Sequence, residues 1–358
     1  MQGKVNRSTI DPFDSTEEGY RNFILFAFHP SITDTVGIFH MLRQFLVILD
    51  SILVMDGNTA PPPNVGLAEN TTLPPSLEEK IVPNSFAGFS WSHLNSIRDY
   101  ILPRKSPLEF LGGANSLLNS EDLGYSNVLR GWLSETQTRE IEAIREEHDV
   151  SLHGVILAAA LTSLTRMLDV ENLSCPSIKV ANDVNLRQNI QIDKPKLGCF
   201  CSLYEADYQT REITSKREFW NLAHELTVKH NQAKEHFNVK ADRKIIPHWC
   251  DMSVATHGNL GLLFRNQSLP EVGLTSIDTW SKPLNEVLQT NIRLEDVFHM
   301  ANMRNMGVSF HHSGHILHGK LNYILTYDTN LIKDQRHAFM VRDETINVLR
   351  MAVDNEQD

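Results

Sequence analysis

Apolar residues between Thr35 and Leu53 recur every three or four positions, which is the spacing of one helical face. They are Ile38, Leu42, Phe45, Leu46, Leu49 and Leu53. Either Thr33 or Asp34 can cap such a helix, because their side chains accept from the free N–H groups of a first turn. The pattern therefore predicts a helix over 35–53 with one apolar face.

Polar side chains mark four further helix starts after residue 130. The patterns S-x-x-Q at 134–137 and S-x-x-E at 215–218 have the spacing of a capping box. Ser151 precedes LHGVILAAALTSLTRML, which is apolar on most faces and is therefore expected to be buried. A last helix should begin near Asp334.

Short apolar runs between turn residues predict the strands. The first, Tyr20–Phe28, reads as a buried strand that ends at His29 and Pro30, because proline cannot donate to a ladder. Later strands are expected at 178–187, Met252–Thr256, Leu274–Trp280, Gly307–His312 and Leu321–Tyr327. A proline-rich connector of low regularity covers roughly residues 56–126. This mixture of helices and strands favours an α/β or α+β fold.

Length and composition restrict the class of protein. The 358 residues suit two lobes or one large α/β unit, and 41% apolar with 22% charged residues is ordinary for a globular protein. A formal net charge of -11 disfavours nucleic acids and anionic membranes as partners. The polar N-terminus has no apolar signal core, and the run Phe45–Met55 contains Asp50 and is too short for a bilayer. We expect a cytoplasmic protein without a transmembrane segment.

Cysteine and histidine spacing indicates no metal site. The four cysteines are thinly spread and make no disulfide framework, although Cys199 and Cys201 would share one face of a strand. Residues 309–318 hold four histidines, which zinc could use as ligands. No cysteine or carboxylate completes an evident site there, and the stretch reads as a strand and hairpin. We therefore predict no metal.

The segment HPSITDT at 29–35 joins a predicted strand to a predicted helix, where active-site groups are common. Its plain interpretation is a strand end with an aspartate helix cap. It also resembles the HHxxxDG motif of the CoA-dependent acyltransferase superfamily, which includes chloramphenicol acetyltransferase, alcohol acetyltransferases and peptide-synthetase condensation domains. Further segments resemble that superfamily in the right order: LPPSLEEKI at 73–81, the helix pair at 132–161, VNLRQNI at 184–190, LGCFCS at 197–202, HGNLG at 257–261 and GKLNYILTYD at 319–328.

The resemblance implies a chloramphenicol acetyltransferase-like α/β fold with two lobes that meet along a tunnel. The expected domains are a remnant of the N-terminal lobe over 1–57, a connector over 58–130 and a C-terminal lobe over 131–358. Relatives carry a substantial segment before the motif, so the N-terminal lobe should be incomplete. Either a protein partner or self-association then covers its exposed apolar surface, or the chain is a shortened isoform or a fragment.

The resemblance also assigns the site residues, and it finds no intact catalytic residue. In relatives the second motif histidine is the general base; here that position is Pro30, and a proline has no titratable group. His29 matches the first motif histidine, which is structural in relatives. Asp34 matches the motif aspartate, which forms an ion pair with an arginine. Arg187 is the expected partner, or else an ordinary surface arginine.

A turn at 257–261 supplies the remaining candidates. By resemblance it lies beside the substrate tunnel, so Asn259 and Gly261 are expected to line that tunnel. His257 is either a spare base or a turn histidine without a catalytic role.

Two functions stay open at this point. One is acyl transfer from an acyl-CoA to an alcohol or amine, with positioning and a base outside the motif replacing the missing histidine. The other is a non-catalytic binding or regulatory protein that kept the fold. The first implies a small-molecule donor and acceptor, with acyl-CoA as co-substrate and no tightly bound cofactor.

Overall fold

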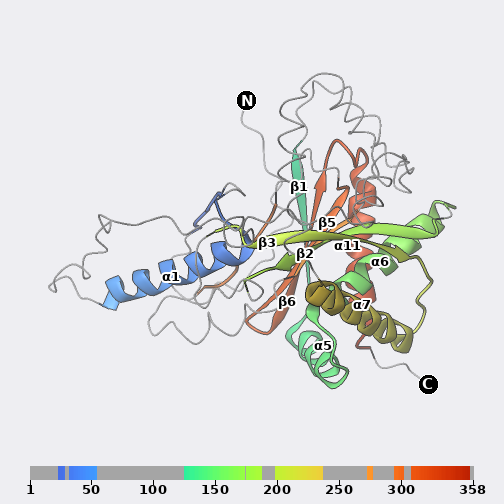
Figure 1. Ribbon diagram of the computed structural model, residues 1–358, viewed down its shortest axis with the longest axis horizontal. Coiled ribbons are helices and arrows are strands. Elements are labelled where there is room, and N and C mark those ends of the chain that lie inside the picture. Colours follow the sequence, from blue (N-terminus) through green and yellow to red (C-terminus); the bar gives the residue numbers. More distant parts are fainter. Residues whose placement is uncertain are drawn as a thin grey trace, which may run out of the picture.

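The computed structural model describes residues 23–28, 32–54, 125–173, 175–187, 198–236, 272–276, 294–301 and 308–354. Within these ranges helices and strands form a mixed α/β fold around one six-stranded sheet (Figure 1). The fold class expected from the sequence is thereby confirmed.

The sheet has the strand order β1-β6-β5-β4-β2-β3. Its strands are β1 (Ser126–Trp132), β2 (Ser177–Asn185), β3 (Cys201–Gln209), β4 (Val272–Ser276), β5 (Phe310–Leu317) and β6 (Lys320–Asp328). β4 runs parallel to both of its neighbours, and the other pairs are antiparallel. A two-residue turn with positive φ at His318 and Gly319 joins β5 to β6, as a type I′ hairpin requires.

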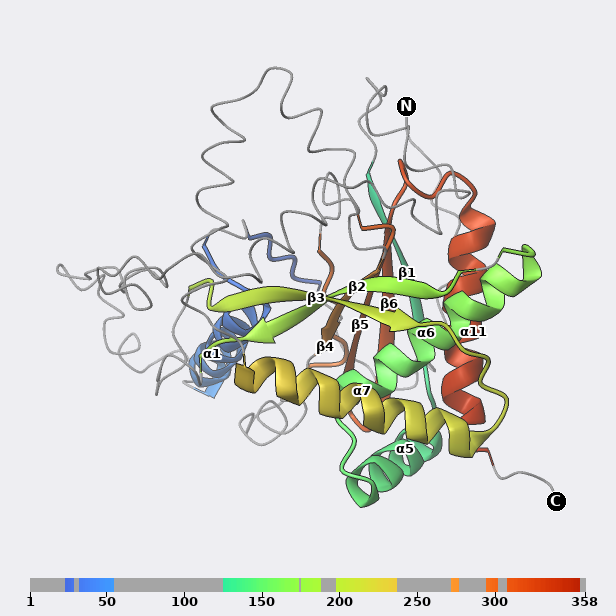
Figure 2. The same cartoon turned by 45° about the vertical axis from the view of Figure 1, so that its right-hand side comes forward.

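Helix α6 is the centre of the hydrophobic core. The described helices are α1 (Thr35–Val54), α5 (Glu135–Glu147), α6 (Leu152–Val170), α7 (Lys216–His236) and α11 (Gln335–Met351). α6 packs against β4 and β5, with α7 and α11 beside it (Figure 2). The side chains of Val155, Ile156 and Leu157 are fully buried. An apolar helix buried on most faces is what its sequence predicted.

The predicted helix starts are confirmed by their caps. The side chains of Ser134 and Gln137 form a complete capping box before α5, and Ser151 caps α6. At the start of α7 the Ser215 hydroxyl accepts from the backbone of Glu218, whose carboxylate accepts from Ser215 N. Asp334 caps α11.

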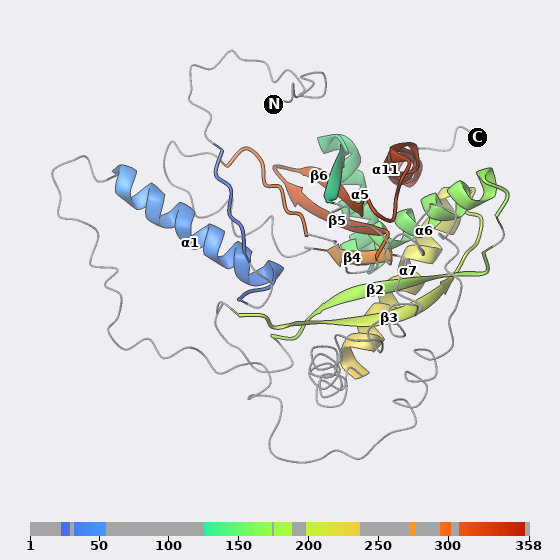
Figure 3. The same cartoon turned by 90° about the horizontal axis from the view of Figure 1, so that it is seen from above.

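Helix α1 lies apart from the other helices. It extends from the ends of β2 and β3, away from α6 and α11 (Figure 3). Two described helices are long and apolar enough to cross a membrane by length and composition: Thr35–Ile52, 22% buried, and Leu152–Val170, 83% buried. The second of these is the core helix α6.

The structure departs from the strand predictions at residues 23–28 and at β1. Residues 23–28 form no strand, and Phe23 and Leu25 are 98% and 92% exposed. An apolar run becomes a buried strand only where a neighbouring strand pairs with it, and no described strand pairs with this one. β1 was not predicted; it begins at the end of the proline-rich stretch. The strand expected at Met252–Thr256 lies outside the described residues.

Candidate functional site

The centre of the candidate site is the ion pair between Asp34 and Arg187. Arg187 Nη1 donates to Asp34 Oδ2 and Nη2 donates to Oδ1, both at 2.8 Å. Each residue is only 7% exposed, so water hardly reaches the pair. Two parallel charge-assisted bonds make this the strong form of the interaction. The ion pair that the resemblance implied is present, and the alternative of a surface arginine is wrong.

Asp34 also caps helix α1. Its Oδ1 accepts from Gly37 N at 2.8 Å, and its backbone oxygen accepts from Ile38 N at 3.0 Å. Its Oδ2 accepts from Phe200 N at 2.7 Å. Each carboxylate oxygen therefore has two donors, one from Arg187 and one from the backbone, which fills the lone pairs of the group. Asp34 is thus a positioning group and not a proton acceptor for a substrate.

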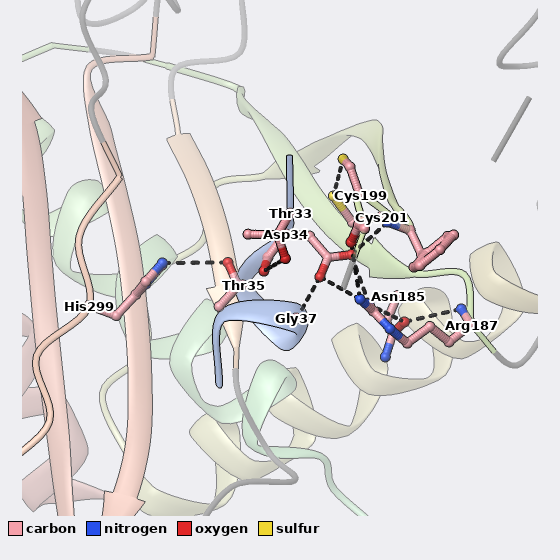
Figure 4. A network of polar contacts seen from close by, with 11 residues as sticks. Thr33, Asp34, Thr35, Gly37, Asn185, Arg187, Cys199, Cys201 and His299 are labelled. Carbon is pink, nitrogen blue, oxygen red and sulfur yellow. Dashed lines mark hydrogen bonds and ion pairs between the residues drawn. The ribbon is translucent and has the colours of Figure 1, made fainter. Parts of the chain in front are cut away.

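Close packing around the ion pair explains two glycines. A Cβ on Gly37 would lie 2.1 Å from Thr33 Oγ1 and 3.4 Å from Arg187 Nη2. Gly198 has a φ of 147°, and its carbonyl accepts from Arg187 Nη2 at 3.2 Å. The guanidinium lies over the Phe200 ring, 5.0 Å from its centroid. These contacts tie the first turn of α1 to the residues that follow β2 and precede β3 (Figure 4).

A second acidic group, Asp183 on β2, lies beside the pair. Burial, followed by the electrostatic influence of Asp34 and Cys199, raises the pKa of Asp183 to about 7. The Sγ atoms of Cys199 and Cys201 are 3.8 Å apart, so the two thiols share one face as their spacing predicted. A hydrogen bond with Cys199, together with burial, raises the pKa of the Cys201 thiol, which makes that thiol a poor nucleophile.

Thr35 faces away from Arg187 and towards His299 (Figure 4). Thr35 Oγ1 lies 3.5 Å from His299 Nε2. The imidazole also lies against Phe39, with 5.8 Å between the ring centroids. Burial lowers the pKa of His299 to about 4, so the ring is neutral at physiological pH. No sequence pattern pointed to this residue, because the contact joins positions 264 apart in the chain.

The histidines of β5 divide between the two faces of the sheet. His312 Nδ1 and the Tyr323 hydroxyl are hydrogen-bonded at 2.7 Å. His311 and His315 point the other way by strand alternation, and both interact electrostatically with His299. Within the part of the chain that the structure describes, no three histidine, cysteine or acidic side chains are grouped to hold a metal ion.

The other predicted site residues lie outside the described residues. They are His29, Pro30, His257, Asn259 and Gly261. Their roles stay predictions that rest on the resemblance alone. The structure thus brings together Asp34 and Arg187, and it adds His299, Asp183 and Phe200.

Comparison with known proteins gives structural likenesses only. No protein-family model matches the chain, and no curated protein matches it. The epimerization domain from the third module of tyrocidine synthetase B is similar at 11% identity and a TM-score of 0.47, over 91% of this chain and 67% of that one. Polyketide synthase associated protein 5 from Mycobacterium tuberculosis is similar at 14% identity and a TM-score of 0.49, over 90% of this chain and 72% of that one.

A third similar structure is much longer than this chain. The peptide-synthetase cyclization-docking bidomain of Sorangium cellulosum has 15% identity and a TM-score of 0.45, over 67% of this chain. The chain spans only 44% of that protein. Other similar structures include the first condensation domain of the calcium-dependent antibiotic synthetase and the acyl transferase PapA2, which are kinds of protein that the sequence resemblance named. At these scores the likeness assigns no activity, so any function has to be argued from the geometry around Asp34.

Proposed function

We propose that this protein transfers an acyl group from an acyl-CoA to an alcohol or amine. The buried ion pair between Asp34 and Arg187 carries this proposal. Its two residues come from the two segments that match the superfamily's motif aspartate and its arginine partner, 153 positions apart. A chance ion pair between unrelated segments is typically exposed to solvent, whereas this pair is bidentate, buried and joined to a helix cap.

The proposal requires a base outside the motif, since Pro30 offers no nitrogen that can accept a proton. Holding the thioester and the acceptor together would supply much of the rate, because orientation alone contributes strongly to such reactions. The donor and acceptor are small molecules, no tightly bound cofactor takes part, and the protein acts in the cytoplasm. A partner or a second copy covers the exposed residues Phe23 and Leu25.

The second candidate function is binding without turnover. One observation favours it: Pro30, which has no titratable group, stands at the position of the motif base. Such a protein would hold an acyl-CoA or its acceptor and pass on a signal through a partner.

The test is release of free CoA. The purified chain is incubated with acetyl-CoA and a panel of primary alcohols and amines, and the thiol is followed with a chromogenic disulfide. We expect slow, acceptor-dependent release, and a faster rate in Pro30→His, which restores an imidazole at the motif position. Absence of release in both proteins, with acetyl-CoA binding retained in calorimetry, would instead establish the binding function.

A further inference from the structure

The imidazole of His299 stands at the first turn of α1, beside the motif. Its Nε2 is 3.5 Å from the hydroxyl of Thr35, the residue that follows Asp34. Asp34 is fixed by Arg187 on one side, so Thr35 and the ring lie on the other side of the same turn (Figure 4). This brings a nitrogen base to within one helical turn of the motif that has lost its own.

The segment that carries His299 is held in place along its length. The His318 ring is hydrogen-bonded to the Leu294 carbonyl. Arg130 Nη2 donates to Asp296 Oδ2 at 2.7 Å, and the same guanidinium lies 5.4 Å from the centroid of the Phe298 ring. These anchors from β1 and from the β5–β6 turn fix where the imidazole points. A base must be held within hydrogen-bond reach of its proton, and this segment supplies that constraint.

The ring has hydrogen-bonding capacity to spare. The contact with Thr35 is long for a hydrogen bond, and Nδ1 is buried without a hydrogen-bond partner among the described residues. A buried polar atom without a partner is uncommon in folded proteins, and a bound ligand is one way to satisfy it. In unliganded sites catalytic hydrogen bonds are often long and shorten when the substrate binds.

The surroundings of the ring keep it neutral and able to accept a proton. His311 and His315 on β5 interact electrostatically with the ring, and Asp296 of its own segment and Arg130 of β1 act in turn on His315. Burial dominates and lowers the pKa of His299 to about 4. The resting ring is a weak base, but negative charge that develops on a bound thioester would stabilise the imidazolium.

From this geometry, and resting on the acyl transfer proposed above, we propose that His299 is the general base that replaces the missing motif histidine. His299 takes the proton from the acceptor hydroxyl while the acceptor oxygen bonds to the thioester carbonyl carbon. The tetrahedral intermediate then collapses, the C–S bond breaks, and His299 returns the proton to the sulfur as free CoA leaves. The products are the ester and CoA, and no further reactant is needed.

The first test compares His299→Gln with His337→Gln, the same change on α11. We expect kcat for CoA release to fall about 100-fold or more in the first variant, with KM for acetyl-CoA unchanged. The acidic limb of the kcat–pH profile should also disappear in His299→Gln. The control His337→Gln should keep the wild-type kcat and the acidic limb. A wild-type kcat in His299→Gln, with native circular dichroism, overturns the proposal.

A second measurement does not depend on turnover. The ring C–H resonance of His299 is assigned by its loss in His299→Gln and followed as a non-hydrolysable thioether analogue of acetyl-CoA and an alcohol are added. We expect a shift at His299 and none at His337. Binding of both ligands without a shift at His299 overturns its assignment as base while leaving acyl transfer standing. Absence of binding in the wild type refutes both proposals.

Discussion

At the scale of single residues, the Asp34–Arg187 pair stabilises the protein only while both partners are present. Both are buried, so removing one leaves the other charge without its partner in a place that water hardly reaches. We expect Asp34→Ala to lower the free energy of unfolding by about 3 to 5 kcal/mol. Urea unfolding followed by tryptophan fluorescence measures this change.

The matched control replaces the whole pair. In Asp34→Leu with Arg187→Met neither charge remains to be desolvated, so the double variant should be closer to wild type than either single variant. Two single losses that simply add in the double variant would contradict this expectation. The double variant should still lose CoA release, because Asp34 also caps α1 and holds Phe200 N.

At the scale of elements, helices α6 and α7 approach closely at Gly154. A Cβ at this position would lie 2.2 Å from Thr227 Oγ1 and 2.6 Å from the Ala223 carbonyl oxygen of α7. Alanine ordinarily stabilises a helix relative to glycine by about 0.5 to 1 kcal/mol. Here the clash wins, and we expect Gly154→Ala to destabilise the protein by about 1 to 3 kcal/mol.

The control separates the two clashes of Gly154→Ala. Adding Thr227→Ala removes the side-chain clash but leaves the backbone clash with Ala223, so the double variant should recover little stability. Thermal unfolding by calorimetry compares the variants. An unfolding temperature for Gly154→Ala at or above that of wild type would show that the helices separate without cost.

Elements with a local cause were predictable from the sequence. Ser134 with Gln137 and Asp334 act within one turn, so the starts of α5 and α11 could be read directly. Strand β1 could not, because its seven residues become a strand only by pairing with β6, some 200 positions later. His299 was missed for the same reason, whereas the Asp34–Arg187 pair was accessible only through a family resemblance.

At the scale of the whole molecule, buried neutral histidines link the fold to pH. Burial is the first cause that lowers the pKa of each of six side chains: to about 4 for His153, His299 and His315, about 3 for His311 and His312, and about 2 for His230. They lie on α6, α7, β5 and the segment 294–301, so they sample both faces of the sheet. Lowering the pH should therefore destabilise the whole sheet and the helices that pack on it.

The sign of the effect is set by proton uptake. In the unfolded chain a histidine takes up its proton near its ordinary pKa of 6.5, while these six stay neutral in the folded protein to well below that value. Unfolding therefore takes up protons, and the free energy of unfolding should fall steadily as the pH drops from about 6.5 towards 4. The raised pKa of Asp183, about 7, acts in the opposite direction over the same range, but it is one group against six.

Urea midpoints at pH 7, 6 and 5 measure this loss of stability. Two single variants, His312→Gln and its control His224→Gln, show whether the buried histidines cause it. His312 is fully buried against Tyr323, whereas His224 is exposed on α7. His312→Gln should be less stable than wild type at pH 7 yet lose less stability on going to pH 5, because one group that protonates only after unfolding is gone. His224→Gln should behave as the wild type does throughout. Midpoints that stay constant from pH 7 to pH 5 would mean that these rings gain their protons without unfolding. The conclusion that burial keeps the His299 ring neutral in the resting protein would then be wrong as well.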